Sequence, residues 1–125
     1  MIKVRDAIEA QLKLIHPRAY FLRAPKGAQL PYLVYTLTTS FMLGEQEVWP
    51  LEVDAWDNDA DSATVDALSR QVADTLHRWR YVGDGISLKV YREGRMALDD
   101  DDARIKRRRV MFQVRSFDLV KRTGE

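Results

Sequence analysis

Three segments of this chain alternate between apolar and polar residues, and this period of two constrains its fold more than any other feature. They are 51–57 (LEVDAWD), 86–92 (ISLKVYR) and the apolar–polar part of 107–119 (RRRVMFQVRSFDL). Successive side chains of a β-strand point to opposite faces, so each segment is typical of a strand with one buried face. A fourth segment, 32–39 (YLVYTLTT), is almost wholly apolar, aromatic or β-branched, which indicates a central strand covered on both faces.

Two further segments have the period of an amphipathic helix. Apolar residues recur every three or four positions from Val4 to Ile15, and again from Val65 to Trp79. The acidic cluster at 57–62 precedes the second of these and is suited to cap its N-terminus. The order helix, strand, strand, helix, strand, strand predicts an α+β fold. We expect a mixed or mostly antiparallel sheet of about four strands, with two helices packed on one face and polar loops at 40–50 and 93–104.

The length and composition indicate one globular domain spanning residues 1–125. The chain has a mass of 14.5 kDa and 46% hydrophobic residues, which is enough for a single core. No apolar stretch approaches the roughly 20 residues that a membrane-spanning helix needs, and no signal-peptide pattern begins the chain, so we expect neither membrane insertion nor secretion. The absence of cysteine excludes disulfides and thiolate chemistry.

Charge is balanced overall but strongly segregated along the chain. The formal net charge is +1, yet the stretch 27–69 holds eight acidic and no basic residues, while the segments on either side are basic. Segregation of this kind is compatible with an ordinary solvated surface. It is also what a subunit would need to bind a copy of itself head to tail through unlike patches.

Motifs for catalysis or metal binding are weak. The segment 57–61 (DNDAD) begins like a calcium-binding loop, but the positions that require glycine and glutamate hold Ser62 and Leu68. The aspartates at 99–102 are neighbours in sequence and repel one another, which favours a solvated loop. His16 and His77 have no accompanying catalytic pattern. We therefore expect a protein that is not an enzyme and that holds no metal or cofactor.

The densest charge run is 104–109 (RIKRRR), directly after the four aspartates. On an alternating strand its basic side chains project to both faces, which favours a contact with acidic neighbours over a continuous nucleic-acid track. Trp79 continues the helical apolar pattern and is expected in the core. Trp49 and Trp56 are expected to lie off the buried face, where they are available to an interface.

Several of these segments together resemble the tail-completion or tail-terminator proteins of long-tailed bacteriophages and prophages. The resemblance rests on 23–35 (RAPKGAQLPYLVY), on 51–57, on the predicted helix 63–79 and on the strand ending in 112–115 (FQVR), and it covers nearly the whole chain. It implies an α+β fold and assembly into a hexameric ring. It also implies that the ring caps the growing tail tube and offers the surface to which the filled head attaches.

The partners implied by this resemblance are further copies of the chain, a tail-tube protein and a head-connector or head-closure protein, with DNA only as passing cargo. The implied location is the virion, and the host cytoplasm during assembly. We hypothesise that the acidic block of one copy faces the basic run of the next. The candidate interface residues are Glu45, Glu47, Trp49, Trp56, Asp57, Asp59, Asp61, Asp99, Asp100, Arg104, Lys106, Arg107, Arg108 and Arg109.

Two alternatives remain open at the level of sequence. One is another structural protein of the same neck region, such as a head-closure or tube subunit, which would share the environment and differ in its partner. The other is a small nucleic-acid-binding α+β module that uses 104–109 with Tyr91 and Phe112. The net charge near zero argues against this module.

Overall fold

The computed structural model describes residues 2–119, which form two helices and one seven-stranded sheet. In chain order the elements are α1 (Ile2–Ile15), β1 (Ala19–Phe21), β2 (Tyr32–Leu37), β3 (Phe41–Leu43), β4 (Gln46–Asp57), α2 (Ala63–Leu76), β5 (Arg80–Gly83), β6 (Ile86–Leu98) and β7 (Lys106–Asp118). No helix among them is long and apolar enough to cross a membrane.

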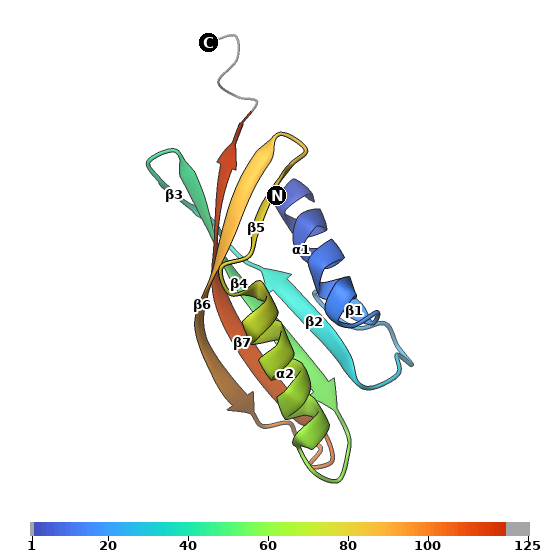
Figure 1. Ribbon diagram of the computed structural model, residues 1–125. Coiled ribbons are helices and arrows are strands. Elements are labelled where there is room, and N and C mark those ends of the chain that lie inside the picture. Colours follow the sequence, from blue (N-terminus) through green and yellow to red (C-terminus); the bar gives the residue numbers. More distant parts are fainter. Residues whose placement is uncertain (1, 120–125) are drawn as a thin grey trace.

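The sheet is mixed and strongly curled. Its strand order is β1-β2-β4-β7-β6-β5, and β3 pairs with β4 beyond the end of β2. Only the β1–β2 pair is parallel. Helix α1 contacts β1, next to one edge of the sheet, and also β6, near the other edge, because the sheet curls around the helix layer (Figure 1).

The expected sheet of about four strands with two helices on one face is therefore wrong. Strands β1, β3 and β5 were missed because three or four residues are too short to display a period; each forms by pairing with a longer neighbour. The segments 40–50 and 93–104, expected as polar loops, contribute the β3–β4 hairpin and the end of β6. Helix α2 also ends at Leu76, three residues before Trp79.

The core lies between the helices and the inner face of the sheet. In β7 the side chains of Val110, Phe112 and Val114 are buried, and those of the alternate residues are only partly buried. The same alternation holds in β2, so this strand is covered fully on one face and not on both. Helices α1 and α2 turn the apolar faces predicted from their period toward these strands.

Tyr35 fastens α1 to the sheet. Its fully buried side chain donates a hydrogen bond from the hydroxyl to Glu9 Oε1, at 2.7 Å. Burial, and after it the hydrogen bond to Glu9, raises the pKa of Tyr35 well above its ordinary value of about 10.

This raised pKa predicts a loss of stability in alkali. Below pH 10 the phenol keeps its proton in both states, so its contribution is fully present. Above pH 10 the unfolded chain loses the proton and the folded chain keeps it, so the free energy of unfolding should fall by about 1.4 kcal/mol per pH unit. Urea unfolding between pH 9 and pH 11.5 should show this slope in the wild type and a reduced slope in Tyr35→Phe. Equal slopes would mean that Tyr35 ionises without penalty in the fold.

Candidate interaction surface

The outer face of the sheet, turned away from both helices, carries the polar side chains of the alternating strands. The strand register places these side chains in rows across the sheet. One row runs Met96, Arg109, Asp54, Val34, and the next runs Leu98, Arg107, Trp56, Tyr32. The acidic strand β4 and the basic strand β7 are thus hydrogen-bonded neighbours within one chain.

Asp54 is the centre of an ion-pair cluster on this face. It is only 6% exposed. Arg107 donates to Oδ2 from Nε (3.0 Å) and Nη2 (2.7 Å). Arg109 donates to Oδ1 from Nε (2.8 Å) and to Oδ2 from Nη2 (3.1 Å), and it lies 3.7 Å from Glu52. These four residues are called the Asp54 cluster below. The hydrogen bond from Arg109 to Asp54 raises the pKa of Arg109.

Aromatic rings continue the Asp54 cluster toward the edge of the sheet. The guanidinium of Arg107 lies 4.5 Å from the ring centre of Trp56, which lies 6.1 Å from Tyr32. Together with the segment 22–24 these groups line a hollow of about 310 Å³. The indole Nε1 of Trp56 is buried without a hydrogen-bond partner. The hollow is shallow and charged, which suits contact with another macromolecule more than enclosure of a small substrate.

The rest of the basic run also finds partners inside the chain. Arg108 points to the inner side, where it donates to Asp66 of α2 at 2.8 Å. Arg104 pairs with Asp102 two residues away, and its hydrogen bonds lower the pKa of Asp102 to about 2. Lys106 lies opposite Asp57 in the β4–β7 register. Arg107, Arg108 and Arg109 are therefore paired within the chain to Glu52, Asp54 and Asp66 of the acidic stretch.

The predicted acidic interface residues fall into three places. Glu45 and Glu47 belong to the β3–β4 hairpin, where Glu47 accepts a hydrogen bond from Ser40 at 2.6 Å. Asp59 and Asp61 precede α2, where Asp59 accepts a hydrogen bond from the Thr64 hydroxyl and Asp61 accepts one from the Ala63 amide. The N-cap residue Ser62 makes no side-chain cap hydrogen bond, so the capping interpretation of 57–62 holds for Asp61 alone. Asp57 is buried, and its Oδ2 atom has no hydrogen-bond partner.

The last two acidic candidates, Asp99 and Asp100, lie in the connection between β6 and β7, where Asp100 accepts a hydrogen bond from the Asp102 amide. That these groups contact a second copy stays a prediction.

The two candidate tryptophans differ. Trp56 lies on the outer face and is half-buried, as expected. The expectation for Trp49 is wrong: it is buried in the core, and its Nε1 donates to Ser116 Oγ at 3.1 Å. Strand β4 starts at Gln46 and so includes Trp49. Trp49, Leu51 and Val53 are alternate residues of this strand, and their side chains therefore lie on the same inner face. Extending the alternation two residues upstream would have revealed this.

Sequence reasoning missed a second cationic group on the outer face. Arg80, Lys89 and Arg115 occupy one row across β5, β6 and β7. The Lys89 amine and the Arg115 guanidinium each lie 5.4 Å from the ring centre of Tyr91. These four residues are called the Tyr91 cluster. The signal was present in the alternation of 86–92 and 107–119, which places residues 89, 91 and 115 on one face once the two strands pair.

Nothing among residues 2–119 forms a metal-binding group of three or more His, Asp or Glu side chains. The pKa of His16 is lowered by burial and by Arg18, and the pKa of Asp66 is lowered chiefly by a hydrogen bond from Ser62 and then by Arg108. Each of these pKa shifts is explained by burial or by a neighbouring side chain, and the two residues lie on different segments of the chain and not in one cleft. The arrangement thus offers charged and aromatic contact surface.

Comparisons with known proteins identify the fold. No protein-family model and no curated protein matches the sequence. Among solved structures, a chain described as "Virion of native gene transfer agent (GTA) particle" superposes with a TM-score of 0.67 at 18% sequence identity. The match covers 87% of this chain and 90% of that chain. The two chains therefore share one fold over nearly their whole lengths.

Proposed function

We propose that this chain is a structural subunit of a phage-type virion, and specifically a tail-terminator subunit that closes the tail tube as a ring. The observation that carries the proposal is the whole-length likeness to a chain of a gene transfer agent virion. The resemblance of 23–35, 51–57 and 112–115 to tail-terminator proteins supports the finer assignment. In this proposal the chain is not an enzyme, and its partners are further copies of itself, the tail-tube protein and the head connector.

The exposed surface fits such a role. Large apolar side chains are exposed on β3 and at the end of β7, and two charged clusters occupy the outer face. Subunits of a cyclic ring meet through two different patches, one on each side. A chain of this size can supply about 800 Å² to each such contact from its 7564 Å² of accessible surface.

The test is incubation of the purified protein with purified tail tubes, followed by electron microscopy of the tube ends. We expect a ring of density on one end only, and we expect capped tubes to stop elongating when tube protein is added. Tubes incubated with buffer are the control. Binding to isolated heads or connectors without binding to tubes would instead assign the chain to head closure. Binding to neither would contradict a virion role at the neck.

A further inference from the structure

We propose that neighbouring copies join head to tail when the Tyr91 cluster of one copy receives the β6–β7 hairpin tip, residues 96–101, of the next. This inference rests on the proposed function and names the surface through which the ring would form. In this inference the cations that contact the neighbouring copy are those of the Tyr91 cluster, and not those of the basic run 104–109.

The three cations of the Tyr91 cluster are without a carboxylate partner in the part of the chain that the structure describes. Within residues 2–119, no carboxylate forms an ion pair with Arg80, Lys89 or Arg115. Arg115 instead donates to the amide oxygen of Gln113 at 2.7 Å, and Lys89 and Arg115 each lie 5.4 Å from the centre of the Tyr91 ring. The aromatic ring and the sheet hold these cations in place on an open face, where they attract an acidic partner.

The arginines of 104–109 are poorer candidates. Arg107 and Arg109 share the nearly buried Asp54, and Arg108 and Arg104 are held by Asp66 and Asp102. An incoming carboxylate would have to compete with these short charge-assisted hydrogen bonds. The Lys89 amine faces no such competition.

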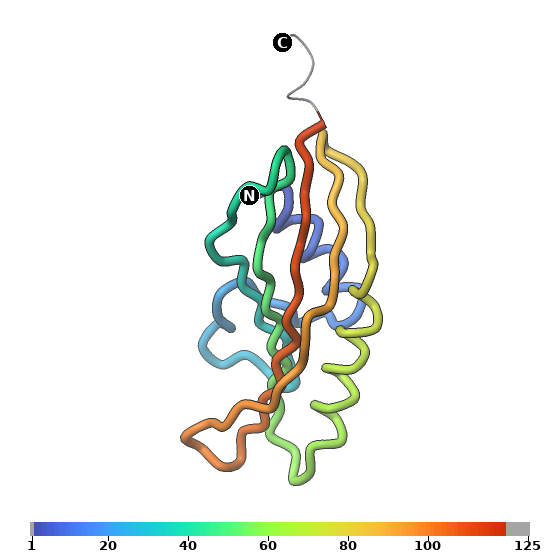
Figure 2. Tube along the Cα trace, turned by 90° about the vertical axis from the view of Figure 1, so that its left-hand side faces the viewer, coloured from blue at the N-terminus to red at the C-terminus, as the bar shows by residue number. Residues whose placement is uncertain are grey.

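The hairpin tip has the complementary chemistry. Asp99 and Asp101 are exposed. The nearby Arg104 pairs with Asp102 and not with either of these two carboxylates. Met96 adds an apolar side chain that is 45% exposed. Figure 2 shows the tip, in orange, projecting to the side of the sheet opposite α2. The alternation of β6 and β7 places the Tyr91 cluster on the outer face, away from the buried residues of both strands.

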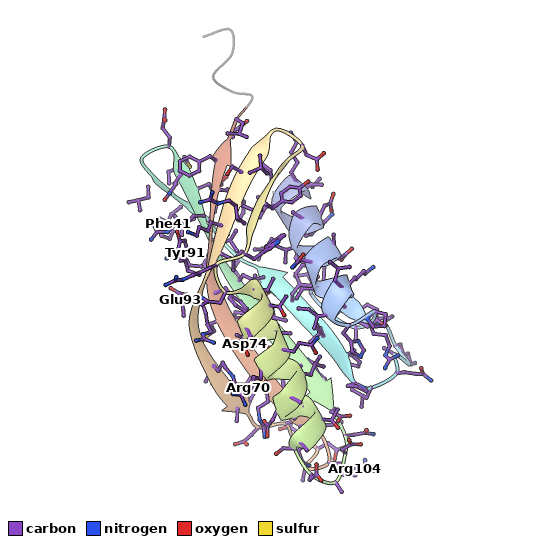
Figure 3. All side chains as sticks on the ribbon, viewed as in Figure 1. Phe41, Arg70, Asp74, Tyr91, Glu93 and Arg104 are labelled. Atoms are coloured by element: carbon purple, nitrogen blue, oxygen red, sulfur yellow. The ribbon has the colours of Figure 1, made fainter. Side chains whose placement is uncertain are left out.

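A copy cannot place its own tip on its own Tyr91 cluster. Leu98, the residue before the tip aspartates, pairs with Arg107, and Arg107 lies eight positions from Arg115 on β7, which is about 26 Å at 3.3 Å per residue. Figure 3 accordingly shows Arg104 at the lower end of the molecule and Tyr91 about halfway up the sheet. Tip and cluster are two different patches at different levels of the sheet, so a copy that gives its tip to one neighbour can receive the tip of another on its cluster, which is a heterologous contact.

Apolar side chains favour a second copy over nucleic acid as the occupant. The row of the Tyr91 cluster continues across β7 to Val48 and Phe41, and Phe41 is 53% exposed. The next row holds Phe117 and Leu43, which are also exposed. A phosphate backbone would leave these side chains uncovered, whereas Met96 beside the aspartates can pack on them while the charges pair.

The test compares three charge variants with the wild type by sedimentation velocity and native mass spectrometry. Lys89→Glu/Arg115→Glu alters the cluster, and Asp99→Lys/Asp101→Lys alters the tip. Lys3→Glu/Lys26→Glu is a control with the same change in net charge as the cluster variant, made at exposed residues of α1 and of the loop between β1 and β2. Far-UV circular dichroism checks that each variant folds.

We expect the cluster and tip variants each to self-associate at least about tenfold more weakly than the wild type, and the control to assemble normally. Mixing the cluster and tip variants should restore assembly as alternating copies, because the intact tip binds the intact cluster and the reversed tip binds the reversed cluster. Combining all four substitutions in one chain should restore assembly. Raising the salt concentration should weaken assembly of the wild type.

If the cluster variant assembles as the wild type does, the inference is wrong. The same holds if the wild type caps tubes while neither the cluster nor the tip variant is weakened in self-association. Either result would leave the proposed function standing. Loss of duplex-DNA binding in the cluster variant without any loss of self-association would assign the Tyr91 cluster to nucleic acid and likewise overturn it. The separate tube assay tests the proposed function itself, and failure of the wild type to bind tube ends there would contradict that function.

Discussion

Replacing Phe112 with alanine should lower the free energy of unfolding by about 4 kcal/mol, the largest effect we expect from a single substitution in this chain. Phe112 is 1% exposed and lies in the middle of β7, whose neighbours β4 and β6 pair with it on both sides. Truncation removes a buried aromatic ring and leaves a cavity that the paired strands cannot collapse to fill. Urea unfolding of the two proteins measures the difference.

Phe117→Ala is the matched control for this prediction. Phe117 lies on the same strand, but its odd position puts it on the outer face, where it is 37% exposed. The same chemical change should therefore cost less than about 1 kcal/mol. Similar losses for the two variants would contradict the assignment of the inner and outer faces, and with it the whole system of rows on which the two clusters depend.

Replacing Asp54 with asparagine should lower the free energy of unfolding by about 2 to 3 kcal/mol. The substitution keeps the shape of the side chain but removes the charge that holds Arg107 and Arg109, and its amide group offers one acceptor oxygen in place of two. Breaking a buried ion pair from one side typically costs 3 to 5 kcal/mol. The loss is set lower here because both arginines are 24% exposed and can recover water.

Asp59→Asn serves as the control for the Asp54 substitution. Asp59 is exposed and accepts one hydrogen bond from Thr64, so the same replacement there should change stability by no more than about 0.5 kcal/mol. The comparison also bears on the acidic–basic interface hypothesis. If Arg107 and Arg109 served a neighbouring copy and not Asp54, the Asp54→Asn variant would unfold at the same urea concentration as the wild type.

Much of the local structure was predictable. The apolar period from Val4 to Ile15 corresponds to α1, and the alternating segments 51–57, 86–92 and 107–119 all lie largely within long strands. These assignments succeed because an element that buries one face must repeat apolar residues with its own geometric period. The short strands β1, β3 and β5 have no room for such a repeat, and they exist only because a longer strand offers its hydrogen bonds.

The candidate surface was predictable only in part. The sequence shows that 27–69 is acidic and that 104–109 is basic, and it correctly places Trp56 on an open face. It does not show that β4 and β7 are adjacent. That adjacency joins Asp54 to Arg107 and Arg109 within one chain, whereas Lys89 and Arg115 form no ion pair within residues 2–119.

The sequence by itself determined which residues face the core and which face outward along each long element, because periods of two and of about 3.6 are local properties of the backbone. Only the tertiary structure decided which charges neutralise one another. Ion pairing depends on distances between strands that are far apart in the chain, and those distances are set by the pairing of β4, β6 and β7. Three acidic residues of the stretch 27–69, Glu52, Asp54 and Asp66, are therefore partners of Arg107, Arg108 and Arg109 in the folded molecule.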